Sequence, residues 1–309
     1  MRMKRLLVIW MAVLLALPAL AGAESRVLSP AAEDSAEGRL TAAVAAALGE
    51  AAEFRPDAAQ TAAENRAAAA NDMLADAETL LCDTEAVLMA GLQGYTAKDL
   101  RTEMKPVARI ARCPLYLVMD EAAAEALGIT DGAGLLAYAE EHAYEADFLF
   151  ARHVEADPED RAMVFLCGEI PVFMELFWPE EVLSALETGD AAAAVLTESE
   201  IRGAERPLRV LCALGETRSE AWPEVPCATE LGLTPCPEPG LYLFASAEAA
   251  EDRIAAAAAA VEGAELAQAC REAGCEFAPL TGEALEETVR DIFADYRDYM
   301  TEEGLYFYE

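Results

Sequence analysis

Short apolar runs alternate with longer amphipathic stretches along most of the chain. The apolar runs are continuous, which is typical of strands that are covered on both faces. They lie at residues 26–28, 79–82, 107–111, 115–119, 148–150, 170–177, 192–196, 208–213 and 241–245. Stretches with helical periodicity lie at residues 35–48, 60–74, 132–142, 158–166, 179–188, 248–261 and 282–299. This alternation predicts an α/β fold with mainly parallel sheets.

A proline-rich segment suggests that the chain is divided into two lobes. Residues 222–240 contain five Pro and two Gly, between a strand that ends near 213 and one that begins near 241. Such a segment is typical of an ordered connection. We therefore expect the chain to cross between lobes near 120 and 240. The first lobe would comprise residues 24–120 and 240–309, and the second lobe residues 121–239.

The N-terminus has the pattern of an export signal. Arg2, Lys4 and Arg5 precede an apolar run at 6–17, which is too short to span a bilayer. The small residues Ala21-Gly22-Ala23 follow. This order predicts a signal peptide over residues 1–23, with cleavage near Ala23 and a periplasmic or secreted protein. An uncleaved membrane anchor is the alternative.

Charge and composition exclude several classes of protein. The 309 residues include 57 Asp and Glu against 22 Lys and Arg, a formal net charge of −35. Nucleic acid is excluded as a partner, because phosphate binding needs clustered basic residues. The acidic residues are interpreted as a solvated surface. The hydrophobic fraction of 54% excludes disorder of the whole chain.

Eight cysteines in an exported chain permit disulfides. Two short spacings are candidates, Cys227 with Cys236 and Cys270 with Cys275. The chain has no CxxC motif and two histidines, so a zinc site is not supported. No D-x-D-x-D-G loop indicates a calcium site. We predict neither a metal nor a cofactor.

An ordered set of segments resembles one known family. The segments are 105–111 (KPVARIA), 114–118 (PLYLV), 186–190 (LETGD), 207–215 (PLRVLCALG) and 222–232 (WPEVPCATELG), with a helix, turn and helix over 253–299. This order resembles the exported receptors of tripartite tricarboxylate transporters, the Bug-type periplasmic binding proteins. The resemblance implies a two-lobed, type II-like α/β fold. It also implies membrane transporter subunits as partners, and a small organic solute, commonly a carboxylate, held between the lobes without catalysis.

The resemblance also places the ligand loops, although their glycines are absent here. The substrate-binding candidates at these loops are Ser29, Asp34, Asp83, Thr84, Arg152, His153, Glu155, Trp178 and Thr197. Asp34 is of a helix-capping type. Asp157 before Pro158 is interpreted first as the N-cap of a helix and second as a ligand contact. Trp178 either lines the cleft or packs in the core.

The loops carry more acid than a receptor for an anion would need. The solute would lie near five acidic residues, namely Asp34, Asp83, Glu85, Glu155 and Asp157. At an effective dielectric constant of about 20, a like-charge pair about 4 Å apart costs roughly 4 kcal/mol. Arg152 and His153 are the nearby compensation that the loops offer. We hypothesise that the solute is cationic, zwitterionic or neutral, or that the site has lost its ligand.

A sensor and an enzyme are the two alternative functions. The two lobes could form an extracytoplasmic sensor or interaction protein without transport, which the sequence does not separate from uptake. An enzyme would need Cys82 or Cys167 close to His142 or His153. The chain has no G-x-S-x-G elbow and no glycine-rich phosphate loop. We therefore predict a protein that is not an enzyme.

Overall fold

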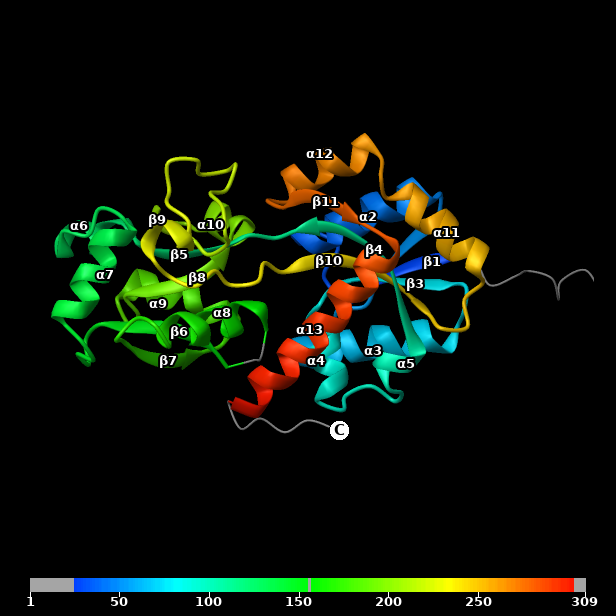
Figure 1. Cartoon of the computed structure of the whole chain (residues 1–309), viewed down its shortest axis with the longest axis horizontal. Coiled ribbons are helices and arrows are strands. Elements are labelled where there is room, and N and C mark those ends of the chain that lie inside the picture. The colour runs from blue at the N-terminus through cyan, green and yellow to red at the C-terminus, as the bar shows by residue number, and fades with distance from the viewer. Residues whose placement is uncertain (1–24, 155–156, 303–309) are drawn as a thin grey trace, which may run out of the picture.

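Two β-sheets form the centres of two lobes in the computed structural model, which describes residues 25–154 and 157–302 (Figure 1). The first sheet has the order β11 (Glu276–Leu280), β4 (Met104–Arg112), β10 (Gly240–Ser246), β3 (Thr79–Thr84), β1 (Arg26–Ser29) and β2 (Ala51–Phe54). The second has the order β7 (Phe173–Phe177), β6 (Leu149–His153), β8 (Ala193–Thr197), β5 (Leu115–Asp120) and β9 (Leu208–Ala213). The predicted signal peptide lies outside the described residues. Within them, no helix is long and apolar enough to span a bilayer.

The two-lobed α/β fold is confirmed, but both sheets are mixed. In the first sheet, β10 runs antiparallel to both β3 and β4. In the second, β5 runs antiparallel to both β8 and β9. The expectation of mainly parallel sheets was wrong for a topological reason. The chain leaves the first lobe through β4 and β5 and returns through β9 and β10, so each outgoing strand pairs with an incoming strand of opposite direction.

Helices cover both faces of each sheet. Those of the first lobe are α2 (Ala36–Leu48), α3 (Ala62–Ala75), α4 (Ala86–Leu92), α5 (Leu100–Glu103), α11 (Glu251–Ala260), α12 (Ala264–Glu272) and α13 (Gly282–Glu302). Those of the second lobe are α6 (Glu121–Leu127), α7 (Gly132–Glu141), α8 (Pro158–Cys167), α9 (Val182–Thr188) and α10 (Glu198–Gly203). Two 3₁₀ turns, η2 (Pro179–Glu181) and η3 (Ala228–Leu231), complete the second lobe.

The central strands are buried on both faces, as their continuous apolar runs predicted. Every residue of β3 is buried. Its Leu80 packs in the core that contains α2, α11 and α12. The next residue, Leu81, packs in the core that contains α3, α4 and α13, because successive strand residues point to opposite faces. In the second lobe, Leu117 and Tyr116 of β5 divide in the same way between two cores.

The strand pairing places the first crossing earlier than the sequence suggested. β4 ends at Arg112 in the first sheet, and β5 begins at Leu115 in the second. The change of sheet therefore lies before β5 and not at 120. The edge strands β2 and β11 were also missed. Their sequences, AAEF and EFAPL, are short and only partly buried, so no continuous apolar run marks them.

The long C-terminal helix α13 connects the lobes. Its first half packs in the core of the first lobe through Leu285 and Val289. Its second half reaches α8 of the second lobe, where Asp295 forms an ion pair with Arg161. The Arg161 guanidinium also lies 5.2 Å from the ring centroid of Tyr296. In Figure 1 this helix lies below the two segments that cross between the lobes, and it runs from the first lobe toward the second.

A buried hydrogen bond at the end of α13 gives a test of this connection. Tyr299 donates its hydroxyl proton to Asp160, a buried carboxylate of α8 that also accepts from Arg152. We expect Tyr299→Phe to lower the free energy of unfolding by about 1–3 kcal/mol, since a charged acceptor loses a partner. Denaturant unfolding measures this loss. The control Tyr144→Phe changes a tyrosine that is 57% exposed and should leave the stability unchanged. Equal stabilities of both variants would contradict the role given to α13.

Candidate functional site

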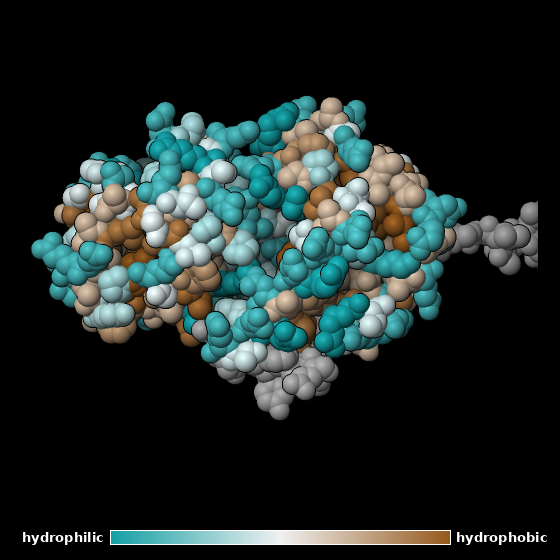
Figure 2. Space-filling view, viewed as in Figure 1, coloured by the Kyte–Doolittle hydropathy of each residue, from teal (hydrophilic) through white to brown (hydrophobic). Residues whose placement is uncertain are grey.

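A cavity of about 460 Å³ lies between the lobes and has walls from both. The first lobe contributes the starts of α2 and α3, Thr84, and the turn at residues 273–275. The second lobe contributes His153, the start of α8 and the start of α10. Cys113 and Pro239, in the two crossing segments, line it as well. Its volume is in the range of about 300–1,000 Å³ that is usual for small-molecule sites. Hydrophilic residues gather along this junction on the face shown in Figure 2.

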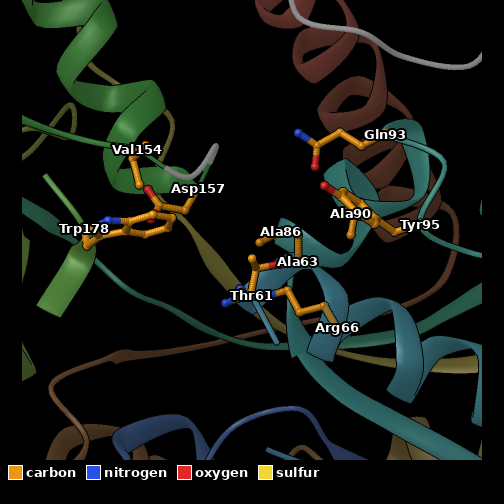
Figure 3. Close-up of a pocket in the computed structure, with 10 residues that line it drawn as sticks. All are labelled: Thr61, Ala63, Arg66, Ala86, Ala90, Gln93, Tyr95, Val154, Asp157 and Trp178. Atoms are coloured by element: carbon orange, nitrogen blue, oxygen red, sulfur yellow. The ribbon is translucent and has the colours of Figure 1, made fainter. Parts of the chain in front are cut away.

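A second cavity of about 220 Å³ adjoins the first, because Arg66 and Asp157 line both. Figure 3 shows Trp178, Val154 and Asp157 of the second lobe facing Thr61 and Arg66 of the first. Trp178 is 47% exposed. It therefore lies at an open end of the cleft and not in the core.

Four helices begin at the larger cavity, each with a side-chain cap. Ser35 Oγ accepts from Gly38 N in α2 at 3.0 Å, and Asp157 Oδ1 accepts from Asp160 N in α8 at 2.7 Å. Thr61 of α3 and Thr197 of α10 form capping boxes. Each helix N-terminus acts as about +0.5 elementary charge, so this convergence alone would favour an anion.

The first turns of these helices, however, already contain carboxylates. These acids are Glu37 in α2, Glu64 in α3, Glu159 and Asp160 in α8, and Glu198 and Glu200 in α10. Glu37, Glu159 and Glu200 line the larger cavity itself. The positive ends of the helices are thus balanced by side chains of the protein.

Arg66 of α3 is a cation of the cleft that the sequence analysis missed. Its Nε lies 3.4 Å from Oδ1 of Asp83, a carboxylate with no exposed side-chain surface. Burial raises the pKa of Asp83 to about 7, although Arg66 acts to lower it. Burial acts to lower the pKa of Arg66, but Asp83 and Glu37 outweigh it, so the guanidinium stays charged. One signal was available: a cation near a helix N-terminus opposes the helix dipole, which suggests another role.

His153 and Asp157 form a second ion pair at the start of α8. His153 Nδ1 lies 2.6 Å from Asp157 Oδ2. Burial acts to lower the pKa of His153, but the hydrogen bond with Asp157 outweighs it, and the pKa is raised overall. Burial, followed by the charges of Asp157 and Glu200, raises the pKa of Glu159 well above its usual value. Burial and neighbouring carboxylates therefore disfavour the ionised form of Glu159 in the cleft.

The same cluster contains side chains that could bind a metal ion. His153, Asp157 and Glu159 offer ligand atoms within 4.8 Å of one another, and these atoms suit a divalent cation. Both oxygens of Asp157 are already used, one by His153 and one by the backbone of Asp160. Helix capping and the ion pair thus account for the cluster, and Glu159 is its available carboxylate.

Apart from Arg66 Nε, which is ion-paired with Asp83, two buried polar atoms of residues that line the larger cavity have no hydrogen-bond partner within the described residues. They are Thr84 Oγ1 and His153 Nε2. Both residues line the larger cavity, and both are at most 7% exposed. Since buried polar atoms are almost always hydrogen-bonded, these two atoms are available to a solute.

The structure brings together about half of the predicted binding residues. Thr84, His153 and Thr197 line the larger cavity, and Trp178 lines the smaller one. Asp83 reaches the cleft through its ion pair with Arg66.

The other predicted residues lie elsewhere in the described chain or outside it. Ser29 is buried, and Asp34 is exposed beside Ser35, which is the residue that caps α2. Neither lines the cavity. Arg152 is paired with Asp160 at 2.6 Å, so the compensating cation of the cleft is Arg66 and not Arg152. Glu155 lies outside the described residues.

Neither predicted disulfide is present. All eight cysteines of the chain are free thiols in the structure. Cys227 contacts Thr229 and Glu216, and Cys236 packs in the core of the second lobe. Cys275 lies beside Cys113 instead of Cys270, with 2.8 Å between the sulfur atoms.

Comparison with known proteins identifies the fold. No family model matches the chain, and no curated protein matches it. Solved structures do match over most of both chains. A TctC solute-binding protein from Polaromonas shares 16% identity, with a TM-score of 0.70 and coverage of 90% of this chain and 97% of that one. The chain has the fold of the TctC and Bug solute-binding proteins.

Two further matches contain ligands. MatC from Rhodopseudomonas palustris, with bound malate, shares 18% identity at a TM-score of 0.64, covering 89% of this chain and 98% of that one. An R. palustris protein with adipate shares 16% identity at a TM-score of 0.70, covering 91% and 97%. The TctC/Bug fold therefore holds small carboxylates in other proteins, with which this chain shares less than a fifth of its residues.

The lobes of this TctC/Bug-like chain touch at Gly274, where the first lobe meets α10. Gly274 has a φ of +75°, and a Cβ there would lie 3.0 Å from Glu198 Cβ and 3.2 Å from Ser199 N. At these distances α10 or the turn at Gly274 must yield by a few tenths of an ångström, which disfavours the closed contact between the lobes. Gly128 has nearly the same φ, +72°, with no atom within 4 Å of the added Cβ. The two glycines thus form a matched pair.

We expect Gly274→Ala to hold the lobes apart and Gly128→Ala to leave their arrangement unchanged. Both variants should lose about 1 kcal/mol of stability, because alanine is strained at positive φ. Small-angle X-ray scattering should therefore show a larger radius of gyration for Gly274→Ala alone. Equal radii for both variants would contradict a closing contact at Gly274.

Proposed function

We propose that this protein is a solute-binding receptor that captures a small organic solute between its two lobes for membrane transporter subunits. The observation that carries this proposal is the 460 Å³ cavity, whose walls come from both lobes and from both crossing segments. A solute held there would contact both lobes at once, and its binding would favour the closed arrangement. The shared fold with TctC and Bug proteins supports the same function.

We further propose that the solute carries a cationic group. The structures with malate and adipate suggest a carboxylate by analogy. In this chain, however, the one described guanidinium that lines the cavity is Arg66, which is paired with Asp83, while Glu37, Glu159 and Glu200 line the same space. An ammonium group would find acceptors there, whereas a dicarboxylate would meet like charges. Thr84 Oγ1 and His153 Nε2 can bind the polar part of the solute.

Native mass spectrometry of freshly purified protein tests whether any small molecule is held. Calorimetric titrations with citrate, succinate, a short diamine and a zwitterionic amino acid then separate the solute classes. Binding of the diamine or the amino acid, without binding of citrate, supports a cationic group. Tight citrate binding would overturn the cationic group and leave the receptor intact, while no bound molecule and no binding in any titration would count against the receptor itself.

A charge-neutralising variant tests the acidic wall. Glu37→Gln should weaken the binding of the cationic solute about tenfold, since a carboxylate that lines the cavity is lost and a loss of about 1.4 kcal/mol is tenfold. Glu141→Gln removes the same charge from an exposed end of α7 and should leave the affinity unchanged. Affinities of the two variants are compared by calorimetry at one ionic strength. Equal weakening by both would indicate a general effect of net charge.

The raised pKa values predict how the affinity depends on pH. As the pH falls through about 7, Asp83 takes up a proton, because its pKa is about 7. His153, whose pKa is also raised, becomes positive in the same direction. Both changes make the cleft less negative, so a cation should bind several-fold more weakly at about pH 6 than at about pH 8.

Asp83→Asn should flatten this pH profile, because it removes one of the titrating groups. Affinities of the wild type and the variant are measured across the same pH range. If the affinity for the bound solute instead increases as the pH falls, the solute is an anion and the proposal of a cationic group is wrong.

A further inference from the structure

Cys113 and Cys275 lie opposite each other across two neighbouring strands. β11 pairs antiparallel with β4, and the register places Phe277 opposite Ala111 and Glu276 opposite Arg112. One step further along the same ladder places Cys275 opposite Cys113. Arg112 and Glu276 also form an ion pair of 3.0 Å, which holds the ends of the two strands together.

The sulfur atoms are already in contact. Their separation is 2.8 Å. A disulfide has an S–S distance of about 2.05 Å and needs Cα atoms about 4.4–6.8 Å apart, which directly opposed residues of antiparallel strands provide. Side-chain movement of less than about 1 Å would bring the two sulfurs to bonding distance.

The pair is also accessible to an oxidant. Both residues are partly exposed and line the cavity between the lobes. Five of the other six cysteines are buried, and the sixth, Cys167, lies beside Met163 instead of another thiol. Cys113 and Cys275 are therefore the thiols among the described residues that combine access with a partner.

We propose that Cys113 and Cys275 form a disulfide that fastens the first crossing segment to β11 at the wall of the cleft. The two thiols lose two protons and two electrons and form one S–S bond. A disulfide of a thiol-oxidising protein, in the compartment to which the predicted signal peptide would direct the chain, accepts them and becomes a dithiol.

The bond would close a loop that contains the whole second lobe. The two cysteines are 162 positions apart in the sequence. β5 to β9 lie between them, so both crossings would be enclosed in one covalent ring. A disulfide stabilises a fold more when it closes a longer loop, because the unfolded chain then loses more conformational entropy. The neighbouring Gly274, which touches α10, would be held at the same time.

Thiol mapping of the full chain, exported with its own signal and purified without reductant, tests the proposal. The free thiols are alkylated, the protein is digested, and peptides are identified by mass spectrometry before and after reduction. We expect one linked species that joins the peptides of Cys113 and Cys275, two hydrogen atoms lighter than the separate peptides. Complete alkylation of all eight cysteines, or a link between any other pair, would overturn the proposal.

Thermal unfolding gives a second, independent readout. Cys113→Ser, Cys275→Ser and the double variant should lower the melting temperature equally, because the loss of either sulfur removes the same bond. Reductant should lower the melting temperature of the wild type to that same value and should leave the melting temperatures of these variants unchanged. The control Cys167→Ser should keep the response to reductant. The bond between Cys113 and Cys275 would be contradicted if the two single variants had additive losses in melting temperature. It would also be contradicted if reductant left the melting temperature of the wild type unchanged.

Discussion

The cleft depends on one constraint, the presence of carboxylates at helix ends that would otherwise attract an anion. α2, α3, α8 and α10 all begin there, and each has an acidic residue in its first turn. Four helix ends contribute about +2 elementary charges in total, which Glu37, Asp157, Glu159 and Glu200 exceed when ionised. Arg66 is neutralised by Asp83. The carboxylates of the cleft thus offset the positive ends of the four helices that begin there.

Three connections hold the two lobes together. The crossing segments pair with each other, since Cys113 N donates to Pro239 O at 2.7 Å. The helix α13 adds a third connection through Arg161 and Tyr299. Both of its contacts are on α8, the helix whose start lines the cleft. A movement of the second lobe must therefore either carry the end of α13 along with α8 or break these contacts. The position of α8 thus couples lobe closure to the C-terminal helix.

The sequence predicted the parts of this structure that depend on continuous apolar runs and helix caps. The central strands and the role of Asp157 as the N-cap before Pro158 follow from local chemistry, and the structure has them. Strand direction and the edge strands β2 and β11 depend on pairing between distant segments, which leaves no local pattern. Arg66 left one local signal, a cation near the start of a helix, but only the fold brings it to Asp83. The contact of Cys113 with Cys275 likewise follows from a strand register that spacing along the chain does not reveal.

The Arg66–Asp83 pair also determines what an anion would have to displace. A carboxylate solute could reach Arg66 only by competing with Asp83, which has no exposed side-chain surface and would remain buried without its partner. Removing one partner of a buried ion pair costs about 3–5 kcal/mol if the other stays charged. Asp83 can avoid much of this cost by taking up a proton, because its pKa is already about 7. Binding of an anion would therefore be linked to proton uptake, whereas a cation would leave the pair intact and bind to the carboxylates beside it.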